Sequence, residues 1–388
     1  MLHTNGHKQP LDVSRVGGKA HDLARHLRDS IVGQDEAINP IVQMYQTHLV
    51  GLTAGGRPIA TFLFLGPTGT GKTRIVEATA EALLGNPGAV IKIDCGEFQH
   101  SHEIAKLIGS PPGYIGHRES LPRLCQETLD KHHTESVKIS IVLFDEIEKA
   151  SDALWNLLLG ILDKGTLTLG DNQRVDFSRS LIFMTSNLGA TEMNAMLSSR
   201  LGFAPTVDSH KDDRLGERIK ASGVEAARRR FTPEFMNRID KIVVFKPLGD
   251  AELEKIFGIE LNTVQRRLFQ STPSCALELH VSEAGKRYLL QEGTDTRYGA
   301  RHLKRAIDRL LVQPLANLIA TEQVRDGDVI SVDFCSASGE LLFWKESSKP
   351  PRQEEVAATG TDEAAHILDA NVAQPVWTTA SQTQVAPV

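Results

Sequence analysis

The chain has 388 residues, of which 40% are hydrophobic and 24% charged, as expected for a globular protein of two or three compact units. The net charge of −6 weighs against nucleic acid as the main partner, because phosphate binding requires a concentrated basic surface. No apolar run reaches membrane-spanning length, and the four cysteines form no C-x-x-C pair, so we expect no membrane partner, reduced thiols and a cytoplasmic location.

The first part of the chain alternates polar and apolar segments. Residues 1–22 are expected to form a flexible lead-in, since they are mostly polar and contain a Gly-Gly pair. An amphipathic segment begins at Leu23 and is followed by a predicted helix over Asp35–Val50. Thr61–Leu65 is apolar and aromatic enough to predict a buried strand.

A phosphate-binding loop follows this strand directly. The loop fits the P-loop pattern and consists of Gly66, Pro67, Thr68, Gly69, Thr70, Gly71, Lys72 and Thr73. Its glycines let the backbone N–H groups turn inward around phosphate oxygens. Lys72 would bring a positive charge to the outer phosphates and Thr73 a hydroxyl ligand for Mg²⁺. Apolar residues at helical spacing come next, so a strand, loop and helix together predict a site for ATP with Mg²⁺.

Further apolar runs predict the rest of an α/β fold. Strands are predicted at Val90–Asp94, Ile139–Phe144, Leu181–Thr185 and Lys241–Phe245. Helical patterns separate these runs, which favours a P-loop parallel sheet flanked by helices. Alternating residues between Thr166 and Phe177 predict a hairpin inserted near the active edge.

Two carboxylates follow the predicted strand Ile139–Phe144. In P-loop ATPases the first acid, here Asp145, holds Mg²⁺, and the second, here Glu146, is placed to act as a general base on the attacking water. Such a base distinguishes hydrolases from kinases, which transfer phosphate to a bound hydroxyl. A buried strand that meets an acidic surface loop is the alternative, and the complete P-loop makes it the weaker one.

A boundary is predicted at Pro247–Asp250. We expect a large domain over 23–247 and a smaller, mainly helical domain over 248–340 that closes with a short strand at Val329–Phe334. Residues 341–388 are expected to form a disordered tail because their composition offers little apolar surface to bury.

Motifs spread over about residues 23–336 resemble the second ATPase domain of the Clp unfoldases and disaggregases, within the AAA+ superfamily. They are, besides the P-loop, Ile31–Ala37, Ser110–Gly116, Asp145–Ala150, Thr185–Gly189, Pro233–Asp240 and Tyr298–Arg305. The large members of that family carry two ATPase rings and further domains. This sequence shows one ATPase module, so we expect a single-ring protein.

The resemblance implies roles for residues outside the P-loop. Asn187 corresponds to a sensor that hydrogen-bonds the attacking water, Arg301 to a second sensor on the small domain, and Ile31 and Val32 to the adenine contacts. Arg238 corresponds to an arginine finger donated to a neighbouring subunit. From spacing alone, Arg238 would form a surface or interface salt bridge. The run 228–230 is expected to be a solvated basic face of a helix.

A finger acting on a neighbour requires repeating head-to-tail contacts, and the family precedent is a homo-oligomeric hexamer. Tyr114 matches the pore loop that grips protein substrates, although a tyrosine packed in a Pro-Gly turn is the simpler interpretation of the residues alone. Leu201, Gly202 and Phe203 resemble a tripeptide that docks a barrel peptidase, or they end a helix. The family's acidic residues and glycines after the tyrosine are replaced here by residues 117–120, His-Arg-Glu-Ser.

The sequence therefore predicts an ATP-hydrolysing ring motor that unfolds or remodels proteins by threading. A nucleotide-gated assembly factor that threads nothing is the main alternative. A DNA-associated AAA+ ATPase is disfavoured because the chain is acidic and lacks a basic stripe.

Overall fold

The protein is described by a computed structural model that covers residues 12, 14–110, 122–198, 209–271, 277–294, 299–324 and 327–346. A five-stranded sheet with the order β2-β3-β6-β1-β7 forms its centre, and every pairing within this sheet is parallel. The strands are β1 (Ala60–Leu65), β2 (Ile91–Asp94), β3 (Ser140–Asp145), β6 (Ser180–Ser186) and β7 (Lys241–Val244). The predicted parallel sheet is confirmed. None of its five strands begins or ends more than one residue away from its predicted position.

Alternation along the central strands divides their side chains between two hydrophobic cores. On β1, Phe62 and Phe64 enter one core, whereas Leu63 and Leu65 enter the other. β3 and β6 alternate in the same way, because successive side chains of a strand point to opposite faces. Both faces are therefore covered, which explains why these strands are continuous apolar runs in the sequence.

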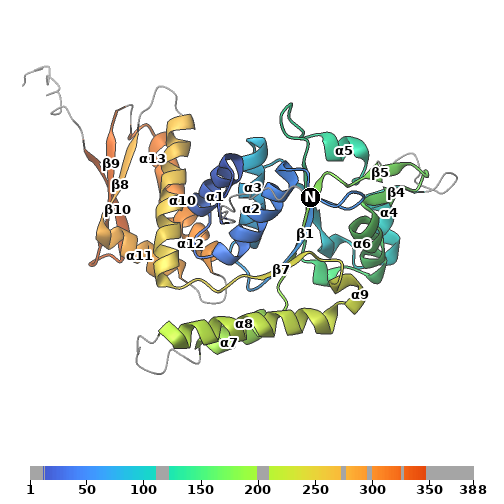
Figure 1. The fold of residues 1–388 in the computed structure, drawn as a ribbon. Coiled ribbons are helices and arrows are strands. Elements are labelled where there is room, and N and C mark those ends of the chain that lie inside the picture. The colour runs from blue at the N-terminus through green and yellow to red at the C-terminus, as the bar shows by residue number, and fades with distance from the viewer. Residues whose placement is uncertain are drawn as a thin grey trace, which may run out of the picture. The chain divides into compact units, whose positions relative to one another are not determined.

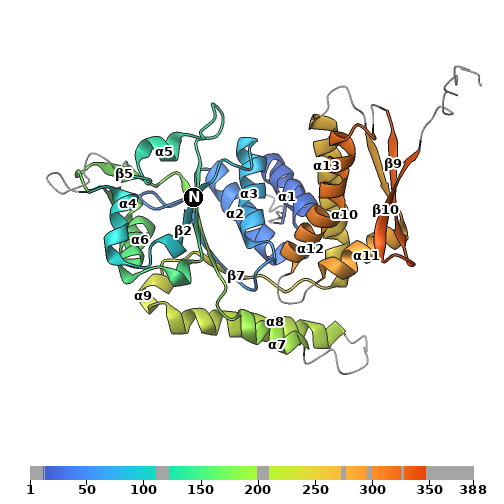
Figure 2. The same cartoon turned by 180° about the vertical axis from the view of Figure 1, so that it is seen from behind.

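Helices cover the two faces (Figures 1 and 2). On one side lie α1 (Gly18–Ser30), α2 (Asp35–Leu49) and α3 (Lys72–Leu84). On the other lie α4 (Ala105–Ile108), α5 (Gln126–Asp130) and α6 (Asp152–Lys164). The predicted lead-in is too long, since α1 begins at Gly18 and buries Ala20 against this core.

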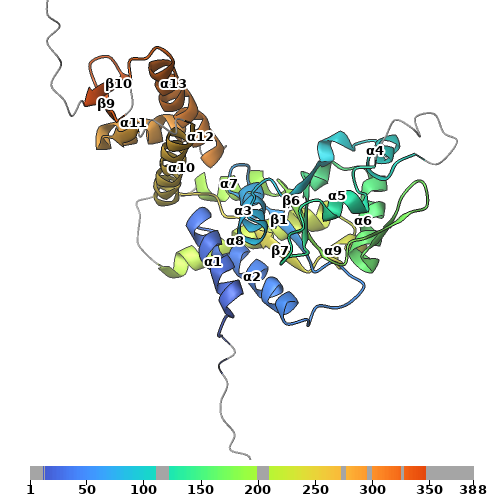
Figure 3. The same cartoon turned by 90° about the horizontal axis from the view of Figure 1, so that it is seen from above.

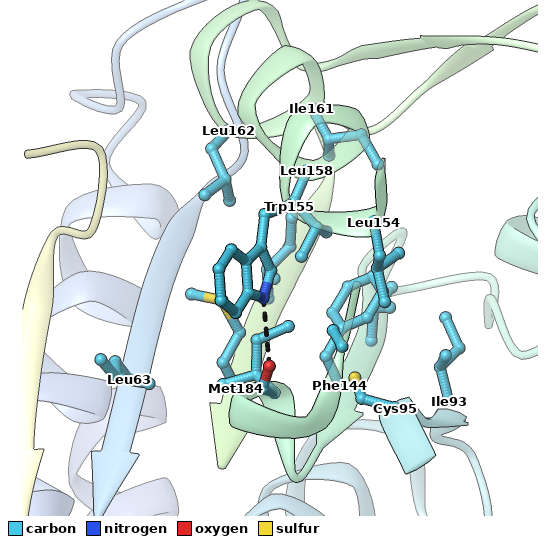
Figure 4. Packing of buried hydrophobic residues seen from close by; sticks show 14 of the residues in the cluster. Leu63, Ile93, Cys95, Phe144, Leu154, Trp155, Leu158, Ile161, Leu162 and Met184 are labelled. Carbon is cyan, nitrogen blue, oxygen red and sulfur yellow. Dashed lines mark hydrogen bonds between the residues drawn. The ribbon is translucent and has the colours of Figure 1, made fainter. Parts of the chain in front are cut away.

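Figure 4 shows how α6 packs on its face of the sheet. Trp155, Leu158 and Leu162 point from the helix toward Leu63 and Met184 of the strands. After α6 comes a two-stranded hairpin of β4 (Thr166–Thr168) and β5 (Arg174–Asp176), so the hairpin prediction is confirmed. The antiparallel helices α7 (Ala190–Ser198) and α8 (Ser209–Arg230) run side by side, and the short α9 (Pro233–Met236) leads from α8 into β7.

The C-terminal part has its own core and its own sheet (Figure 3). Its helices are α10 (Asp250–Ser271), α11 (Glu283–Gly293), α12 (Ala300–Ile307) and α13 (Gln313–Ala320), and a π-helical turn, Asp308–Val312, joins the last two. Its sheet has the order β10-β9-β8 and consists of β8 (Glu278–Val281), β9 (Val329–Cys335) and β10 (Glu340–Glu346).

Two features of this sheet differ from the sequence prediction. β8 was not predicted. β10 occupies residues 340–346, whereas a disordered tail was expected from residue 341 onward. The error at β10 arises because its outward-facing Leu342 and Trp344 are exposed, so the segment lacks the burial pattern of a core strand. The compact part of the chain ends at Glu346, and residues 347–388 lie outside the described ranges.

No helix among the described residues combines the length and the apolar character needed to cross a bilayer.

Candidate nucleotide-binding site

The P-loop joins the carboxyl end of β1 to the first turn of α3. Gly66 has a φ of 142°, and a Cβ at this position would lie 2.6 Å from the carbonyl oxygen of Phe245, so only glycine fits. Lys72 is the first residue of α3 and Gly71 its N-cap. The loop thus places the N-terminus of a 13-residue helix, whose first N–H groups have no partner within the helix, at the carboxyl end of the sheet.

Lys72 is the buried cation of the loop. Its ammonium donates hydrogen bonds to the carbonyl oxygens of Gly66 (2.6 Å) and Pro67 (2.8 Å) and to Oδ1 of Asn187 (2.9 Å). Burial lowers the pKa of Lys72 to about 8, and the carboxylates of Glu148 and Asp145 partly offset this shift. The ammonium of Lys72 is therefore a strong hydrogen-bond donor, and negative charge brought close to it would raise its pKa.

The two predicted acids lie at the carboxyl end of β3. Asp145 is 20% exposed, accepts a hydrogen bond from the hydroxyl of Thr185, and pairs with the ammonium of Lys92 at 2.9 Å. Glu146 has a left-handed φ of 58°, which is uncommon outside glycine and turns its side chain out of the strand direction. Its carboxylate pairs with Lys149 at 2.5 Å. Both acids thus pair with a lysine, and neither pairing was predicted from the sequence.

Asn187 stands next to these acids because β6 pairs with β3 in parallel register. Its Nδ2 donates to Oε1 of Glu146 at 3.4 Å, and its Oδ1 accepts from Lys72. The backbone N–H of Asn187 donates to Oε1 of Glu148 at 3.0 Å. The structure therefore brings the predicted sensor, base and P-loop lysine together, and it adds Glu148, which sequence reasoning did not single out.

A cavity of about 560 Å³ extends from the P-loop. Its lining includes most of the predicted site, namely Ile31, Val32, Thr68, Gly69, Thr70, Gly71, Lys72, Thr73, Asp145, Glu146, Asn187 and Arg301. Gly66 and Pro67 do not line it, and they act through the carbonyls that accept from Lys72. Ile31 is buried and Val32 half-buried, as expected for residues that pack on a flat base.

The C-terminal part supplies one wall of this cavity. Besides Arg301, the wall contains residues that the sequence did not single out as site residues, namely Leu248 just before α10, Ile256, Ile259, Glu260, Thr263 and Arg267 of α10, and Ala300 and Lys304 of α12. The N–H of Ala300 donates to the carbonyl of Gly69 at 3.1 Å, so α12 begins in contact with the P-loop. No local sequence signal marks the α10 residues, because only tertiary packing brings them to the cavity.

Arg238 lies outside this cavity. Its guanidinium donates to the carbonyl of Glu234 at 3.0 Å and pairs with the carboxylates of Glu234 (3.1 Å) and Asp163 (3.6 Å). The side chain is 25% exposed. Arg238 therefore is not part of the site formed by its own chain, and its role as a finger stays a prediction.

The predicted pore residue Tyr114 and the tripeptide Leu201, Gly202 and Phe203 fall outside the described residues.

Comparison with known proteins matches two domains. Residues 57–242 match the AAA domain (Cdc48 subfamily), and residues 248–332 match the C-terminal D2-small domain of ClpB protein. The chaperone protein ClpB of Aquifex aeolicus is 36% identical over 340 residues, which is 88% of this chain and 32% of that protein. The chloroplastic chaperone protein ClpC of Pisum sativum is 36% identical over 345 residues, which is 88% of this chain and 36% of that protein.

Solved structures of Hsp104 share the fold. The closed state with ATPγS and FITC casein aligns with a TM-score of 0.68 and 29% identity, over 84% of this chain and 52% of that one. The extended complex of Saccharomyces cerevisiae Hsp104 with casein gives a TM-score of 0.70 and 30% identity over the same shares.

The chain spans about a third of the length of the curated relatives it matches. The first domain match contains the P-loop and its two acids, and the second covers most of the smaller C-terminal part. The chain belongs to the AAA+ ATPases and has the AAA domain and D2-small domain of the Clp chaperones.

Proposed function

We propose that this chain hydrolyses ATP and uses the energy to unfold or remodel proteins as part of a homo-oligomeric ring. The observation that carries the proposal is the convergence of Lys72, Glu146 and Asn187 within hydrogen-bond distance at one end of the sheet. A phosphate-binding lysine, a carboxylate and an amide so arranged suit the activation of water beside a phosphoryl group.

Mg²⁺ fits the oxygen groups of this site. Asp145 offers a carboxylate at the edge of the cavity and Thr73 a hydroxyl in its lining, and both are the hard oxygen ligands that Mg²⁺ prefers. Among the described residues no cluster of three or more His, Cys, Asp or Glu side chains forms a metal cage. A site with few protein ligands suits Mg²⁺, which retains waters and binds substrate phosphates; when bound it would neutralise phosphate charge.

Glu146 acts as the general base in this proposal. Its side chain is 35% exposed and projects from a turn next to the cavity, so it can contact a water there. Asn187 donates to the same carboxylate and orients it. The ammonium of Lys149 forms an ion pair with the carboxylate of Glu146. In this proposal the carboxylate must release that ammonium, at least in part, before it accepts a proton from water.

Arg238 completes the site of a neighbouring subunit in this proposal. Its position outside its own cavity and its partial exposure support a role in trans, because a finger must reach across an interface. Such a head-to-tail contact closes into a ring, and a hexamer is the proposed state. Tyr114 would face the pore, protein chains would be the substrates, and a barrel peptidase would dock at Leu201, Gly202 and Phe203.

The Clp relatives and the Hsp104–casein structures support the choice of protein substrates over the non-threading alternative. Cys95, Cys125 and Cys335 are free thiols, which supports the proposed cytoplasmic location.

The test is the variant Glu146→Gln. It retains the size of the side chain but removes the base, so we expect ATP binding within a few-fold of the wild type and turnover reduced by about 10²- to 10⁴-fold. Glu135→Gln, at an exposed position away from the cavity, is the matched control and should leave both values unchanged. Rapid hydrolysis by Glu146→Gln, measured as phosphate release, would overturn the assignment of the base.

A further inference from the structure

The turn that carries Glu146 is held from outside by two side chains. Residues Ile147–Lys149 form a single 3₁₀ turn directly after Glu146. The indole N–H of Trp155 donates to the carbonyl of Ile147 at 3.1 Å, which is the dashed line in Figure 4. Arg230 donates to the next carbonyl, that of Glu148, from both Nε (3.2 Å) and Nη2 (2.9 Å). Consecutive carbonyls of the turn therefore each accept a side-chain hydrogen bond.

Arg230 and Trp155 also contact each other. The guanidinium carbon lies 4.3 Å from the centroid of the indole ring, a cation–π distance. Trp155 is only 8% exposed and packs edge-on against Phe231, the residue after Arg230, at 5.5 Å between ring centroids. Two N–H groups of Arg230 therefore bind the Glu148 carbonyl while the planar guanidinium lies over the indole ring. A lysine ammonium could not make both contacts in this geometry.

This contact separates Arg230 from the rest of the basic run. Arg228 is exposed, and Arg229 pairs with Glu225 within the same helix in solvent. For these two residues the expected solvated face holds. Arg230, the last residue of α8, is exposed as well, but its guanidinium also reaches the turn after β3.

The turn that Arg230 holds contains a residue that positions Asn187. The carboxylate of Glu148 accepts from the backbone N–H of Asn187, and its carbonyl accepts from Arg230. Glu146, two residues earlier, has a positive φ and therefore depends on its surroundings to keep its conformation. Movement of the turn would displace the base and the sensor together.

We propose that Arg230 is a positioning residue for ATP hydrolysis, which holds the 146–149 turn so that Glu146 and Asn187 stay aligned in its own subunit. The proposal rests on the proposed function. Arg230 also lies eight positions before Arg238 in the same segment, so the alternative is that it supports the finger acting on the neighbour. The two possibilities predict opposite results when defective subunits are mixed.

The first measurement compares single variants in steady-state ATP hydrolysis. For Arg230→Ala we expect kcat to fall about 10- to 100-fold, because a charged hydrogen-bond donor is lost, with KM within about twofold of the wild type. Arg230→Lys should restore little, and Arg229→Ala, the matched control one residue away, should behave as the wild type. Trp155→Phe retains an aromatic ring but lacks the N–H donor, and it should lower kcat by a smaller factor. An unchanged kcat in Arg230→Ala would overturn the proposal.

The second measurement mixes variants at equal concentration before assembly. Glu146→Gln mixed with Arg238→Ala should regain activity, because some sites then combine an intact base with an intact finger; failure here would count against the proposed function itself. Arg230→Ala should regain activity with Arg238→Ala and none with Glu146→Gln, since its own base is misaligned and its finger intact. Recovery with Glu146→Gln, or with neither partner, would overturn the positioning role.

Discussion

The contact between α12 and the P-loop gives the sharpest single prediction. Gly299, the N-cap of α12, has φ 52° and ψ −145°, a conformation that residues with a side chain rarely adopt. A Cβ at this position would lie 2.9 Å from the carbonyl oxygen of Gly69 and 3.3 Å from that of Thr68. Both atoms are backbone, so neither can move aside as a flexible side chain would. Gly299→Ala should therefore strain or break this contact.

The magnitude follows from the conformation. A residue other than glycine held in such a region costs about 1–3 kcal/mol. The protein can avoid this cost by withdrawing α12, and with it Arg301, from the P-loop, so the penalty falls on the nucleotide-binding arrangement. Because about 1.4 kcal/mol corresponds to a factor of ten, we expect Gly299→Ala to weaken binding of a fluorescent ATP analogue by about 5- to 150-fold.

A second glycine provides the control. Gly327 has a φ of 80°, but none of the described residues would come within 4 Å of a Cβ at this position, so Gly327→Ala adds backbone strain without a clash. It should lower the free energy of unfolding by about 1 kcal/mol and leave the affinity for the analogue unchanged. Equal affinity in Gly299→Ala and the wild type, or the same loss of affinity in both variants, would refute the argument that α12 must touch the P-loop.

Two further predictions concern charge and packing. Bound phosphates raise the pKa of Lys72 above its value of about 8, so affinity is full below that pH and falls as the pH rises through it, by about tenfold between about pH 7.5 and 9.1. Titration with the fluorescent analogue at constant ionic strength checks this, and a flat profile would contradict it. Phe183→Ala should cost about 3–5 kcal/mol in urea unfolding, because the ring is fully buried and stacks on Phe62 at 5.1 Å. Phe269→Ala, at a 47% exposed position, should change stability by no more than about 0.5 kcal/mol.

The fold was predictable where burial leaves a clear sequence pattern. The central strands are buried on both faces and are therefore continuous apolar runs, which the sequence reveals without an alignment. β8 and β10 belong to a smaller sheet, and their outward-facing residues, such as Glu278 and Trp344, are exposed. A short strand with one exposed face carries a weaker pattern, and this is why both were missed.

The site was predictable to the extent that its residues belong to contiguous motifs. The P-loop and the two acids are local patterns, and the parallel register then brings Asn187 beside them. Arg230 has no such pattern, because it reaches the Glu148 carbonyl from 82 positions away in the chain. The wall formed by α10 depends in the same way on contacts between distant segments.

The lysine partners of the two acids affect how the site would bind a metal ion. Asp145 and Glu146 carry their own counter-ions, Lys92 and Lys149, as part of the fold. A metal ion that bound Asp145 would therefore substitute for the ammonium group of Lys92 and would not neutralise a bare charge. Metal binding would then be an exchange of counter-ions at Asp145. Its net affinity would be the difference between the attraction of the carboxylate for the metal and for Lys92, and the displaced Lys92 could contact bound phosphates.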